Sequence, residues 1–180
     1  MAKTTQNIKR IALIGAESTG KTTLARALAL RFNTVWVPEY AREYMTLNPG
    51  EYDITDIEDI TRQHLRQEEE LSLRAKKLLI TDTELITSAI WCEDVFGNCP
   101  KWIEEQITGH KYDLYLLTSN DLPWVADPVR VNSQRRDYFF NLYKRTLEEN
   151  KLPFEIISGR YEARLMCAIN AIRKHFGEII

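Results

Sequence analysis

A glycine-rich motif near the start of the chain constrains the fold more than any other feature. The stretch from Gly15 to Thr22 reads GAESTGKT and matches G-x-x-x-x-G-K-[ST] at every fixed position. An apolar run, RIALI, precedes it, and KTTLARALALRF follows it with leucine and alanine at helical spacing. In this order of strand, turn and helix, the glycines permit a tight turn and the helix N-terminus favours an anion. The motif predicts a phosphate-binding loop, and the alternative is a turn that merely contains glycine and lysine.

The residue types in this loop have distinct predicted roles. Lys21 is placed to reach the β and γ phosphates of a nucleotide, and Thr22 is placed to bring a hydroxyl to Mg²⁺. The guanine-reading NKxD pattern of GTPases is missing after the fourth apolar run, which continues as LLTSND, so ATP is the favoured nucleotide. The other candidate ATP-binding residues are the remaining loop positions, one residue of the following helix and one distant arginine: Gly15, Glu17, Ser18, Thr19, Gly20, Thr23 and Arg136.

Apolar runs and helical patterns alternate along the whole chain. The apolar or β-branched runs are RIALIG, TVWVP, KLLITDT, YDLYLLTS and FEIIS. Such alternation is typical of a parallel sheet that helices cover on both faces. At 180 residues, without a linker or repeat, the chain is expected to form one domain, residues 1–180. Ligands bind such sheets at the carboxyl ends of the strands. The polar residues and the glycine expected there are Gly15, Glu39, Asp82, Ser119 and Ser158.

Two acidic residues follow apolar runs and are candidates for the chemistry. Asp82 ends the run LLITD, the position from which an acid holds the water shell of Mg²⁺ in phosphate-loop proteins. Glu39 follows the second run and could orient a hydroxyl that attacks the γ phosphate, or accept its proton. The structural alternatives are a helix cap for Asp82 and an ion pair of Glu39 with Arg42 or Arg10. Asp82 could also be the base, with Mg²⁺ held mainly by Thr22, and the sequence does not separate these assignments.

A long connection without periodicity, NDLPWVADPVRVNSQRR, follows the fourth apolar run. Connections of this length in compact domains are commonly functional. Kinases of small molecules commonly close a lid over the reacting phosphates, which expels water and brings in a guanidinium that neutralises charge in the transition state. We therefore expect a lid over about residues 119–136, with Arg130 as its catalytic arginine. The alternative is a solvated loop whose arginines pair with Asp127 and Asp137.

Several aromatic side chains are candidates to stack on a flat or cationic ring. They are Tyr40, Tyr44, Trp91 and Trp124. Packing is the alternative for each of them. The candidate acceptor-binding residues combine three of these aromatic residues with charged neighbours: Glu39, Tyr40, Arg42, Trp91, Trp124 and Asp127.

The composition argues against several classes of function. The formal net charge of −2 gives no long-range attraction to polyanions, so nucleic-acid binding through bulk charge is not expected. Three cysteines without paired spacing argue against a disulfide framework and a transition-metal site. The polar start of the chain and the lack of an apolar run of ~18 residues predict a cytoplasmic protein without a membrane span. The oligomeric state is left open.

Several stretches of the chain also resemble a known family in order and spacing. They are GAESTGKTTLARALA, PEYAREY, LLITDTELITSAIW, YDLYLLTSNDLPWVADPVR and LEENKLPFEII. On these residues the chain resembles the ribosylnicotinamide kinase domain of the bacterial NAD-salvage protein NadR, within the AAA-type ATPases. The resemblance runs from about Lys9 to His175. Its most specific part is PWVADPVR, because the phosphate-loop fold does not demand that segment.

This resemblance implies a three-layer α/β/α phosphate-loop fold, nucleoside-kinase-like, with strand order 2-3-1-4-5. It also implies transfer of the ATP γ phosphate to the 5′-hydroxyl of nicotinamide riboside, giving nicotinamide mononucleotide. It places Asp82 at the acidic catalytic or metal position. By the same resemblance, the acceptor side holds Glu39, Tyr40 and Arg42, and the lid holds Trp124, Asp127 and Arg130.

Two departures from the family narrow what the resemblance carries over. The adenylyltransferase and DNA-binding portions of NadR have no counterpart in this sequence, so neither activity is expected. Pro128 stands where the family usually has glycine, and a fixed backbone angle there would stiffen lid closure.

Two other functions compete with the nicotinamide riboside kinase. One is a kinase of another nucleoside, and the other is an ATP-binding switch or ATPase that acts through a protein partner. The arginine-bearing segment and the acidic, aromatic mouth of the crevice favour a kinase.

Overall fold

The computed structural model describes residues 8–109, 112–126 and 132–177. The strands are β1 (Lys9–Ile14), β2 (Trp36–Val37), β3 (Leu78–Asp82), β4 (Leu114–Thr118) and β5 (Phe154–Ile157). The helices are α1 (Lys21–Arg31), α2 (Tyr40–Leu47), α3 (Ile54–Ser72), α4 (Leu85–Phe96), α5 (Lys101–Gly109), α6 (Arg136–Glu149) and α7 (Glu162–Phe176), and the short 3-10 helix η1 (Ser133–Arg135) leads into α6.

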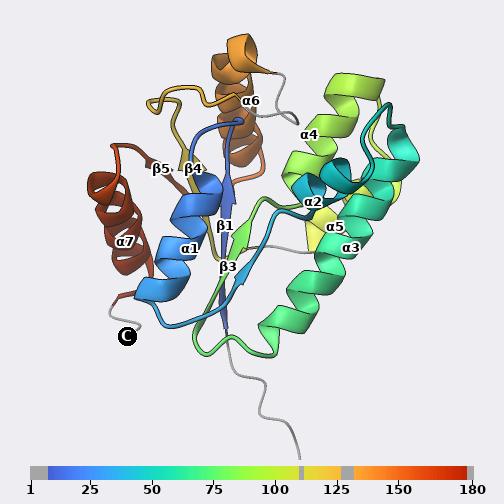
Figure 1. The fold of residues 1–180 in the computed structure, drawn as a ribbon. Coiled ribbons are helices and arrows are strands. Elements are labelled where there is room, and N and C mark those ends of the chain that lie inside the picture. The colour runs from blue at the N-terminus through green and yellow to red at the C-terminus, as the bar shows by residue number, and fades with distance from the viewer. Residues whose placement is uncertain (1–7, 110–111, 127–131, 178–180) are drawn as a thin grey trace, which may run out of the picture.

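The five strands form one parallel sheet with the order β2-β3-β1-β4-β5. Helices α1 and α7 cover one face of this sheet, and α3, α4 and α6 lie on the other side (Figure 1). This is a three-layer α/β/α fold with strand order 2-3-1-4-5, which confirms the expected fold class. Because β1 is the central strand, the turn after it opens at the middle of the carboxyl edge, where ligands bind in such sheets.

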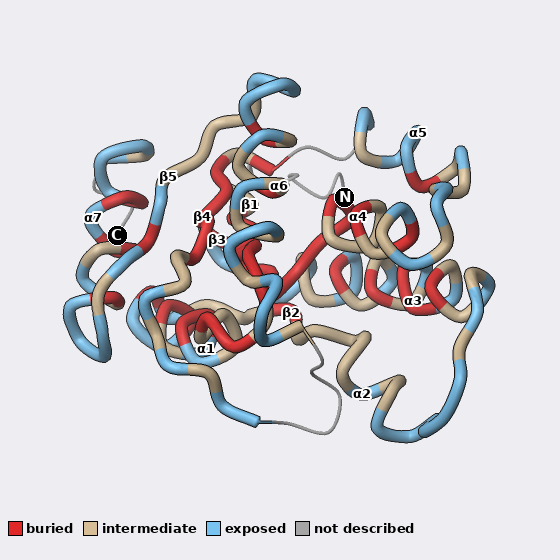
Figure 2. The backbone as a smooth tube through the Cα atoms, turned by 90° about the horizontal axis from the view of Figure 1, so that it is seen from above, coloured by how far each residue is buried: buried red, intermediate tan, exposed pale blue. Residues whose placement is uncertain are grey.

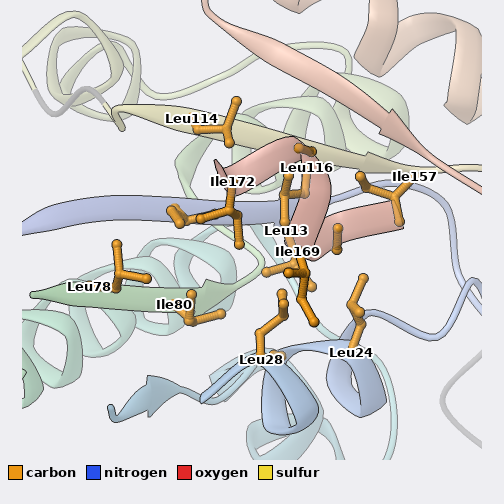
Figure 3. Close-up of a cluster of buried hydrophobic side chains, with 14 of the residues drawn as sticks. Leu13, Leu24, Leu28, Leu78, Ile80, Leu114, Leu116, Ile157, Ile169 and Ile172 are labelled. Atoms are coloured by element: carbon orange, nitrogen blue, oxygen red, sulfur yellow. The ribbon is translucent and has the colours of Figure 1, made fainter. Parts of the chain in front are cut away.

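Alternate residues of the central strands point into the two helical layers. In β1, Ile11 and Leu13 pack against α1 and α7, whereas Ala12 and Ile14 pack against α4 and α6. The central strands β1, β3 and β4 are largely buried, and the outward sides of the helices are exposed (Figure 2). Figure 3 shows the cluster on the α1 and α7 side, whose labelled residues are Leu13, Leu24, Leu28, Leu78, Ile80, Leu114, Leu116, Ile157, Ile169 and Ile172. Burial on both faces fixes the sheet as a rigid base for the loops at its carboxyl edge.

The segment after β2 differs most from the sequence-based expectation. Strand β2 is only two residues long, and the helix α2, which no periodic pattern predicted, begins at Tyr40. The helix is only eight residues long and none of its residues is fully buried, so its apolar spacing covers little more than two turns. Helix α3 begins after Asp53, which caps it and forms a capping box with Asp56.

One buried carboxylate lies away from the edge of the sheet at which the strands end. Glu68 of α3 is fully buried, and it accepts hydrogen bonds from the Arg10 guanidinium and, at 2.5 Å, from the Tyr112 hydroxyl. A buried charge must be paired in this way because desolvation is costly. Arg10 therefore pairs with Glu68 rather than with Glu39.

The remaining general features of the chain are simple. The cysteines Cys92, Cys99 and Cys167 are free thiols, as their spacing predicts. Within the described residues, no helix is both long and apolar enough to cross a membrane.

Candidate active site

The phosphate loop joins β1 to α1 and takes left-handed backbone conformations at several positions. Gly15 and Gly20 have φ angles of 142° and 80°, and Ser18 between them has a φ angle of 58°. A Cβ atom at Gly15 would lie 2.4 Å from the Thr118 hydroxyl oxygen, and one at Gly20 would lie 2.9 Å from Leu122 Cδ1. The backbone conformation therefore favours glycine at both positions, and the close approach of Thr118 also requires it at Gly15. The motif folds as a tight turn that ends at the N-terminus of α1.

The ammonium group of Lys21 lies against this turn. Its Nζ donates hydrogen bonds of 2.9 Å to the carbonyl oxygens of Gly15 and Ala16. The lysine and the N-terminus of α1 together make the mouth of the loop positive. Phosphate oxygens would replace two neutral acceptors by charged ones, and such charge-assisted hydrogen bonds are the stronger kind.

The threonines of the motif occupy three different environments. Thr19 is fully buried, its hydroxyl donates to the Ala16 carbonyl at 2.8 Å, and its oxygen lies 2.7 Å from the Thr118 hydroxyl. Its side chain therefore braces the loop, and it can offer a phosphate only its backbone amide. Thr22 is half-buried in the first turn of α1, whereas Thr23 is exposed.

Asp82 lies at the end of β3, beside the loop, and is fully buried. Within the described part of the chain, neither of its carboxylate oxygens has a hydrogen-bond partner. The pKa of Asp82 is raised to about 7, mainly by burial and then by the charge of Glu39, against the opposing effects of Lys21, Thr22 and Arg26. The Thr22 hydroxyl lies near enough to lower the pKa of Asp82, but it forms no hydrogen bond with either carboxylate oxygen. A buried acid this close to a lysine and without partners is poised to bind a cation or a proton.

The residues after Asp82 form a strained turn into α4. Thr83 has a φ angle of 74°, which is rare for a β-branched residue, and its amide donates to the Leu13 carbonyl at 3.0 Å. Glu84, not Asp82, caps α4 by accepting a 2.9 Å hydrogen bond from the Ile86 amide. The helix-capping alternative for Asp82 is therefore wrong. Strain of this kind persists only where the surrounding structure holds it, and it often marks functional sites.

Glu39 is the residue before α2 and is half-buried. Its charge raises the pKa of Asp82, so the two carboxylates lie close together. Among the described residues, Glu39 takes part in none of the ion pairs. On the neighbouring surface of α1, the exposed Arg26 lies over the Trp36 ring, 5.3 Å from its centroid, and lowers the pKa of Asp82. Arg26 adds a positive charge that the sequence motifs did not indicate.

The expected lid segment, residues 119–136, is hydrogen-bonded to the phosphate loop from both of its described parts, residues 119–126 and 132–136. The Val125 amide donates to the Ser18 hydroxyl at 2.9 Å, and the Asn132 amide donates to the Glu17 carboxylate at 3.0 Å. Glu17 and Ser18 were candidates for ATP binding, but their side chains bind this segment here. Arg136, the last residue of this segment, also contacts the phosphate loop, because its guanidinium donates to the carbonyls of Leu122, at 2.9 Å, and Ser18, at 3.3 Å.

The other arginines of this segment have different positions. Arg135 pairs with Asp94 of α4, and its guanidinium lies over the rings of Tyr138 and Phe139. Asp137 accepts a hydrogen bond from Asn120 at 2.9 Å instead of pairing with an arginine. Arg130, Asp127 and Pro128 lie outside the described residues.

The candidate stacking residues fall into separate groups. The Tyr40 and Tyr44 rings lie 6.3 Å apart on α2, and the Tyr44 hydroxyl donates to Asp56 at 2.5 Å. Trp91 is packed edge-on against Tyr52, and its indole N–H donates to the Tyr52 hydroxyl at 3.0 Å. The half-buried Trp124 lies one residue before Val125, the amide of which is bound by the phosphate loop.

The donor set beside the loop fits Mg²⁺ better than a transition metal. In the described residues, no group of three histidine, cysteine or acidic side chains could hold a metal ion. Mg²⁺ instead uses one or two protein oxygens together with water and substrate phosphates. The buried carboxylate of Asp82, with both oxygens free of partners, and the adjacent Thr22 hydroxyl meet that need.

A central phosphate loop, a buried acid at the end of the adjacent strand and the strand order 2-3-1-4-5 together define a nucleoside-kinase-like phosphate-loop fold. The chain belongs to the AAA domain family, the model of which matches residues 10–164. It is 31% identical over 178 residues to the Escherichia coli protein named Trifunctional NAD biosynthesis/regulator protein NadR, and 29% identical to the Salmonella typhimurium protein of the same name. Each alignment covers 95% of this chain but only 43% of the relative.

Solved structures show the same fold. A NadR protein in complex with NR superposes with a TM-score of 0.79 at 23% identity, covering 94% of this chain and 50% of that one. A NadR protein in complex with NAD and AMP-PNP gives a TM-score of 0.77 at 24% identity, with the same coverage. Thymidylate kinase from Ehrlichia chaffeensis gives a TM-score of 0.64 at 16% identity, covering 92% of this chain and 97% of that one.

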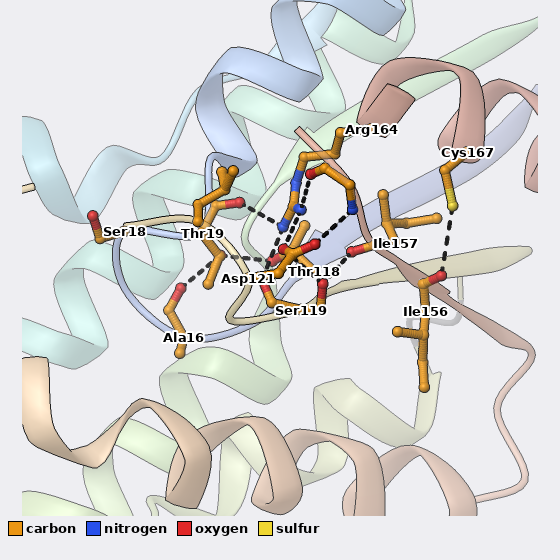
Figure 4. Close-up of polar contacts among 12 residues, drawn as sticks. Ala16, Ser18, Thr19, Thr118, Ser119, Asp121, Ile156, Ile157, Arg164 and Cys167 are labelled. Atoms are coloured by element: carbon orange, nitrogen blue, oxygen red, sulfur yellow. Dashed lines mark hydrogen bonds and ion pairs between the residues drawn. The ribbon is translucent and has the colours of Figure 1, made fainter. Parts of the chain in front are cut away.

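One residue at the site escaped the sequence analysis altogether. Arg164 of α7 is 4% exposed, and its guanidinium reaches the phosphate loop and the start of the expected lid segment (Figure 4). Arg164 lies 145 positions from the loop residue whose carbonyl it binds, Thr19, so no local motif could have joined them.

Proposed function

We propose that the chain is an ATP-dependent kinase that transfers the γ phosphate of ATP to the 5′-hydroxyl of nicotinamide riboside, giving nicotinamide mononucleotide. The observation that carries this proposal is the grouping of Lys21, Asp82 and Glu39 at one edge of the sheet. A phosphate loop alone is common to many proteins, but two neighbouring acids without ion pairs in the described chain suit a metal ion and an attacking hydroxyl.

The relatives support the choice of acceptor. The curated ones are named for NAD biosynthesis and regulation, and the solved NadR complexes contain NR in one case and NAD with the ATP analogue AMP-PNP in the other. Since the chain spans less than half of each curated relative, we propose only this activity and no other function of those proteins. The alternative functions, a kinase of another nucleoside and an ATP-dependent switch, have no observation in their favour.

In the proposed reaction, the acceptor hydroxyl oxygen forms a bond to the γ phosphorus. The bond from that phosphorus to the β–γ bridging oxygen breaks, ADP leaves, and the hydroxyl proton passes to a carboxylate. Phosphoryl transfer depends mainly on positioning and on stabilising the charge of the transferred group. Lys21 and the N-terminus of α1 supply positive charge on the donor side.

Asp82 and Glu39 have different roles in this proposal. Asp82, buried beside Lys21 and Thr22, would hold Mg²⁺ together with the Thr22 hydroxyl. Bound Mg²⁺ would neutralise charge on the phosphates. Glu39, half-buried at the start of α2, would then orient the acceptor hydroxyl and take its proton. Tyr40 and Arg42 follow Glu39 on the same helix and would contact the acceptor.

We also propose that residues 119–136 act as a lid of this single-domain kinase. The hydrogen bonds of Glu17 and Ser18 to Asn132 and Val125 support this role, because they connect the segment to the loop that would hold the phosphates. Arg130 and Asp127 remain the proposed catalytic arginine and acceptor-side acid of the lid.

A panel of acceptors tests the function. Purified protein would be incubated with Mg²⁺, ATP and, separately, nicotinamide riboside, adenosine, guanosine, cytidine, uridine and thymidine, and mass spectrometry would detect the addition of one phosphate. We expect rapid product formation with nicotinamide riboside and little with the others. Faster phosphorylation of another nucleoside would show that the acceptor is wrong, and ATP hydrolysis at the same rate with and without any nucleoside would contradict a kinase.

A further inference from the structure

The guanidinium of Arg164 connects three segments that are far apart in the sequence. One of its terminal nitrogens, Nη2, donates 2.9 Å hydrogen bonds to the carbonyls of Thr19 and Ser119. The other, Nη1, donates to the carbonyl of Gly159 at 2.9 Å and to the carboxylate of Asp121 at 2.6 Å. The phosphate loop, the start of the expected lid segment and the turn before α7 therefore meet on one buried side chain (Figure 4).

The surroundings of Arg164 hold its side chain in one position. The Gly159 amide donates to Asp121 at 2.6 Å, and the Ser119 hydroxyl donates to the same carboxylate at 2.9 Å. Burial raises the pKa of Asp121, but the hydrogen bonds from Arg164, Gly159 and Ser119 outweigh this effect and lower the pKa. The carboxylate therefore stays ionised opposite the arginine. A planar guanidinium with fixed donors is thus confined between a carboxylate and three carbonyls.

The bond to Thr19 has a consequence for the phosphate loop. In a trans peptide unit, the carbonyl of one residue and the amide of the next point in opposite directions. Because the Thr19 carbonyl points to the buried Arg164, the Gly20 amide points away from it. In the described chain, that amide donates no backbone hydrogen bond, so it remains available to an anion at the mouth of the loop. Arg136 holds the preceding carbonyl, that of Ser18, in a similar way.

We propose that Arg164 is a positioning residue for nucleotide binding. It fixes the peptide between Thr19 and Gly20 so that the Gly20 amide faces the triphosphate, and it locks this loop to the first residues of the lid segment. This inference rests on the proposed ATP site, but it does not depend on which molecule accepts the phosphate.

Titration calorimetry of Arg164→Lys with Mg²⁺–ATP and with Mg²⁺–tripolyphosphate tests the proposal. Lysine keeps the charge but cannot hold four acceptors in the plane of a guanidinium. Losing the oriented contacts should raise the Kd for both ligands about tenfold, with the binding stoichiometry and the circular dichroism spectrum unchanged. The matched control is Arg173→Lys, a change at an exposed residue of the same helix, which should leave both Kd values as in the wild type.

The outcomes separate the possible failures. An unchanged Kd in Arg164→Lys, or a lower stoichiometry at an unchanged Kd, would overturn the positioning role, since the second result is that of a purely structural residue. If Arg164→Lys does not fold, Asp121→Asn provides the same test, because it removes the charged acceptor of Nη1 and should raise the Kd for tripolyphosphate about threefold. No rise in that variant would also reject the proposal. Wild-type protein that binds ATP yet phosphorylates no nucleoside would refute the proposed function and leave this inference intact.

Discussion

The proposed donor side, which is the phosphate loop, and the proposed acceptor side, which is the pair Asp82 and Glu39, are built in different ways. On the donor side, two side chains of the phosphate loop already have partners in the protein: Lys21 binds two loop carbonyls, and Thr19 binds the Ala16 carbonyl. On the acceptor side, the oxygens of Asp82 have no hydrogen-bond partner in the described chain, and Glu39 makes no ion pair there.

This difference indicates what each side contributes. A loop held by its own hydrogen bonds is pre-organised, and it binds phosphate without a further cost of ordering. A buried carboxylate without partners is unfavourable in the free protein, and a cation or a substrate can remove that penalty. The donor side therefore fixes the position of the phosphates, whereas the acceptor side becomes more stable when a cation or a substrate binds.

The largest expected effect comes from removing the only ammonium group of the loop. Lys21→Ala should lower kcat/KM for ATP by about a thousandfold or more, because no other loop side chain replaces its charge on the phosphates. Steady-state kinetics of the variant measure this, and Lys76→Ala, a change at an exposed lysine remote from the motif, is the control. Near-normal turnover in a folded Lys21→Ala protein would show that the loop is not the donor site.

Removing one carboxylate from the acceptor side should have the next largest effect. Asp82→Asn is expected to lower kcat by about a hundredfold and to raise the Mg²⁺ concentration needed for half-maximal rate, because a neutral amide binds the ion weakly. At pH 8, where Asp82 is mostly ionised, Glu39→Gln should lower kcat with little change in the Mg²⁺ requirement. A shift of the Mg²⁺ requirement in Glu39→Gln alone would mean that Glu39 holds Mg²⁺ and that Asp82 accepts the proton. Glu149→Gln, on the exposed surface of α6, serves as the control.

The raised pKa of Asp82 predicts a pH dependence of ligand binding. Burial and the charge of Glu39 raise this pKa to about 7 in the free protein, so Asp82 is mostly ionised at pH 8 and mostly protonated at pH 6. Because Mg²⁺–ATP needs the ionised form, its affinity should fall about tenfold from pH 8 to pH 6. Titrations across this range check the prediction. Asp82→Asn should lose this dependence, and an equally steep profile in that variant would assign it to another group.

The smallest effect is expected at the aromatic residues. Trp91→Phe keeps a ring against Tyr52 but removes the indole hydrogen bond, so the KM for nicotinamide riboside should rise by no more than about threefold. Trp102→Phe, on α5, is the matched control. A tenfold or larger rise in Trp91→Phe would show that the acceptor uses the indole directly and that this part of the acceptor side is also pre-organised.

The sequence predicted the turn of the phosphate loop and the sheet because both depend on short-range patterns. The loop motif fixes glycine, lysine and threonine within eight positions, and alternating apolar runs indicate parallel strands. Asp82 was found for the same reason, since it ends an apolar run.

Features that depend on long-range contacts were missed. Arg164 acts on backbone carbonyls of segments that no sequence pattern connects to it. Helix α2 was also missed, because it is only eight residues long and none of its residues is fully buried. The sequence did not indicate that the side chains of Glu17 and Ser18 bind the expected lid segment, because these contacts depend on where residues 125 and 132 lie in space.

Phosphorus-31 NMR of one reaction tests the central claim most directly. Wild-type protein, Mg²⁺, ATP and nicotinamide riboside would be mixed and followed over time. The account predicts that the γ resonance of ATP is replaced by one phosphomonoester resonance in a one-to-one ratio with ADP, and that this change is lost in Lys21→Ala. Appearance of inorganic phosphate instead, at a rate that the riboside does not alter, would contradict it.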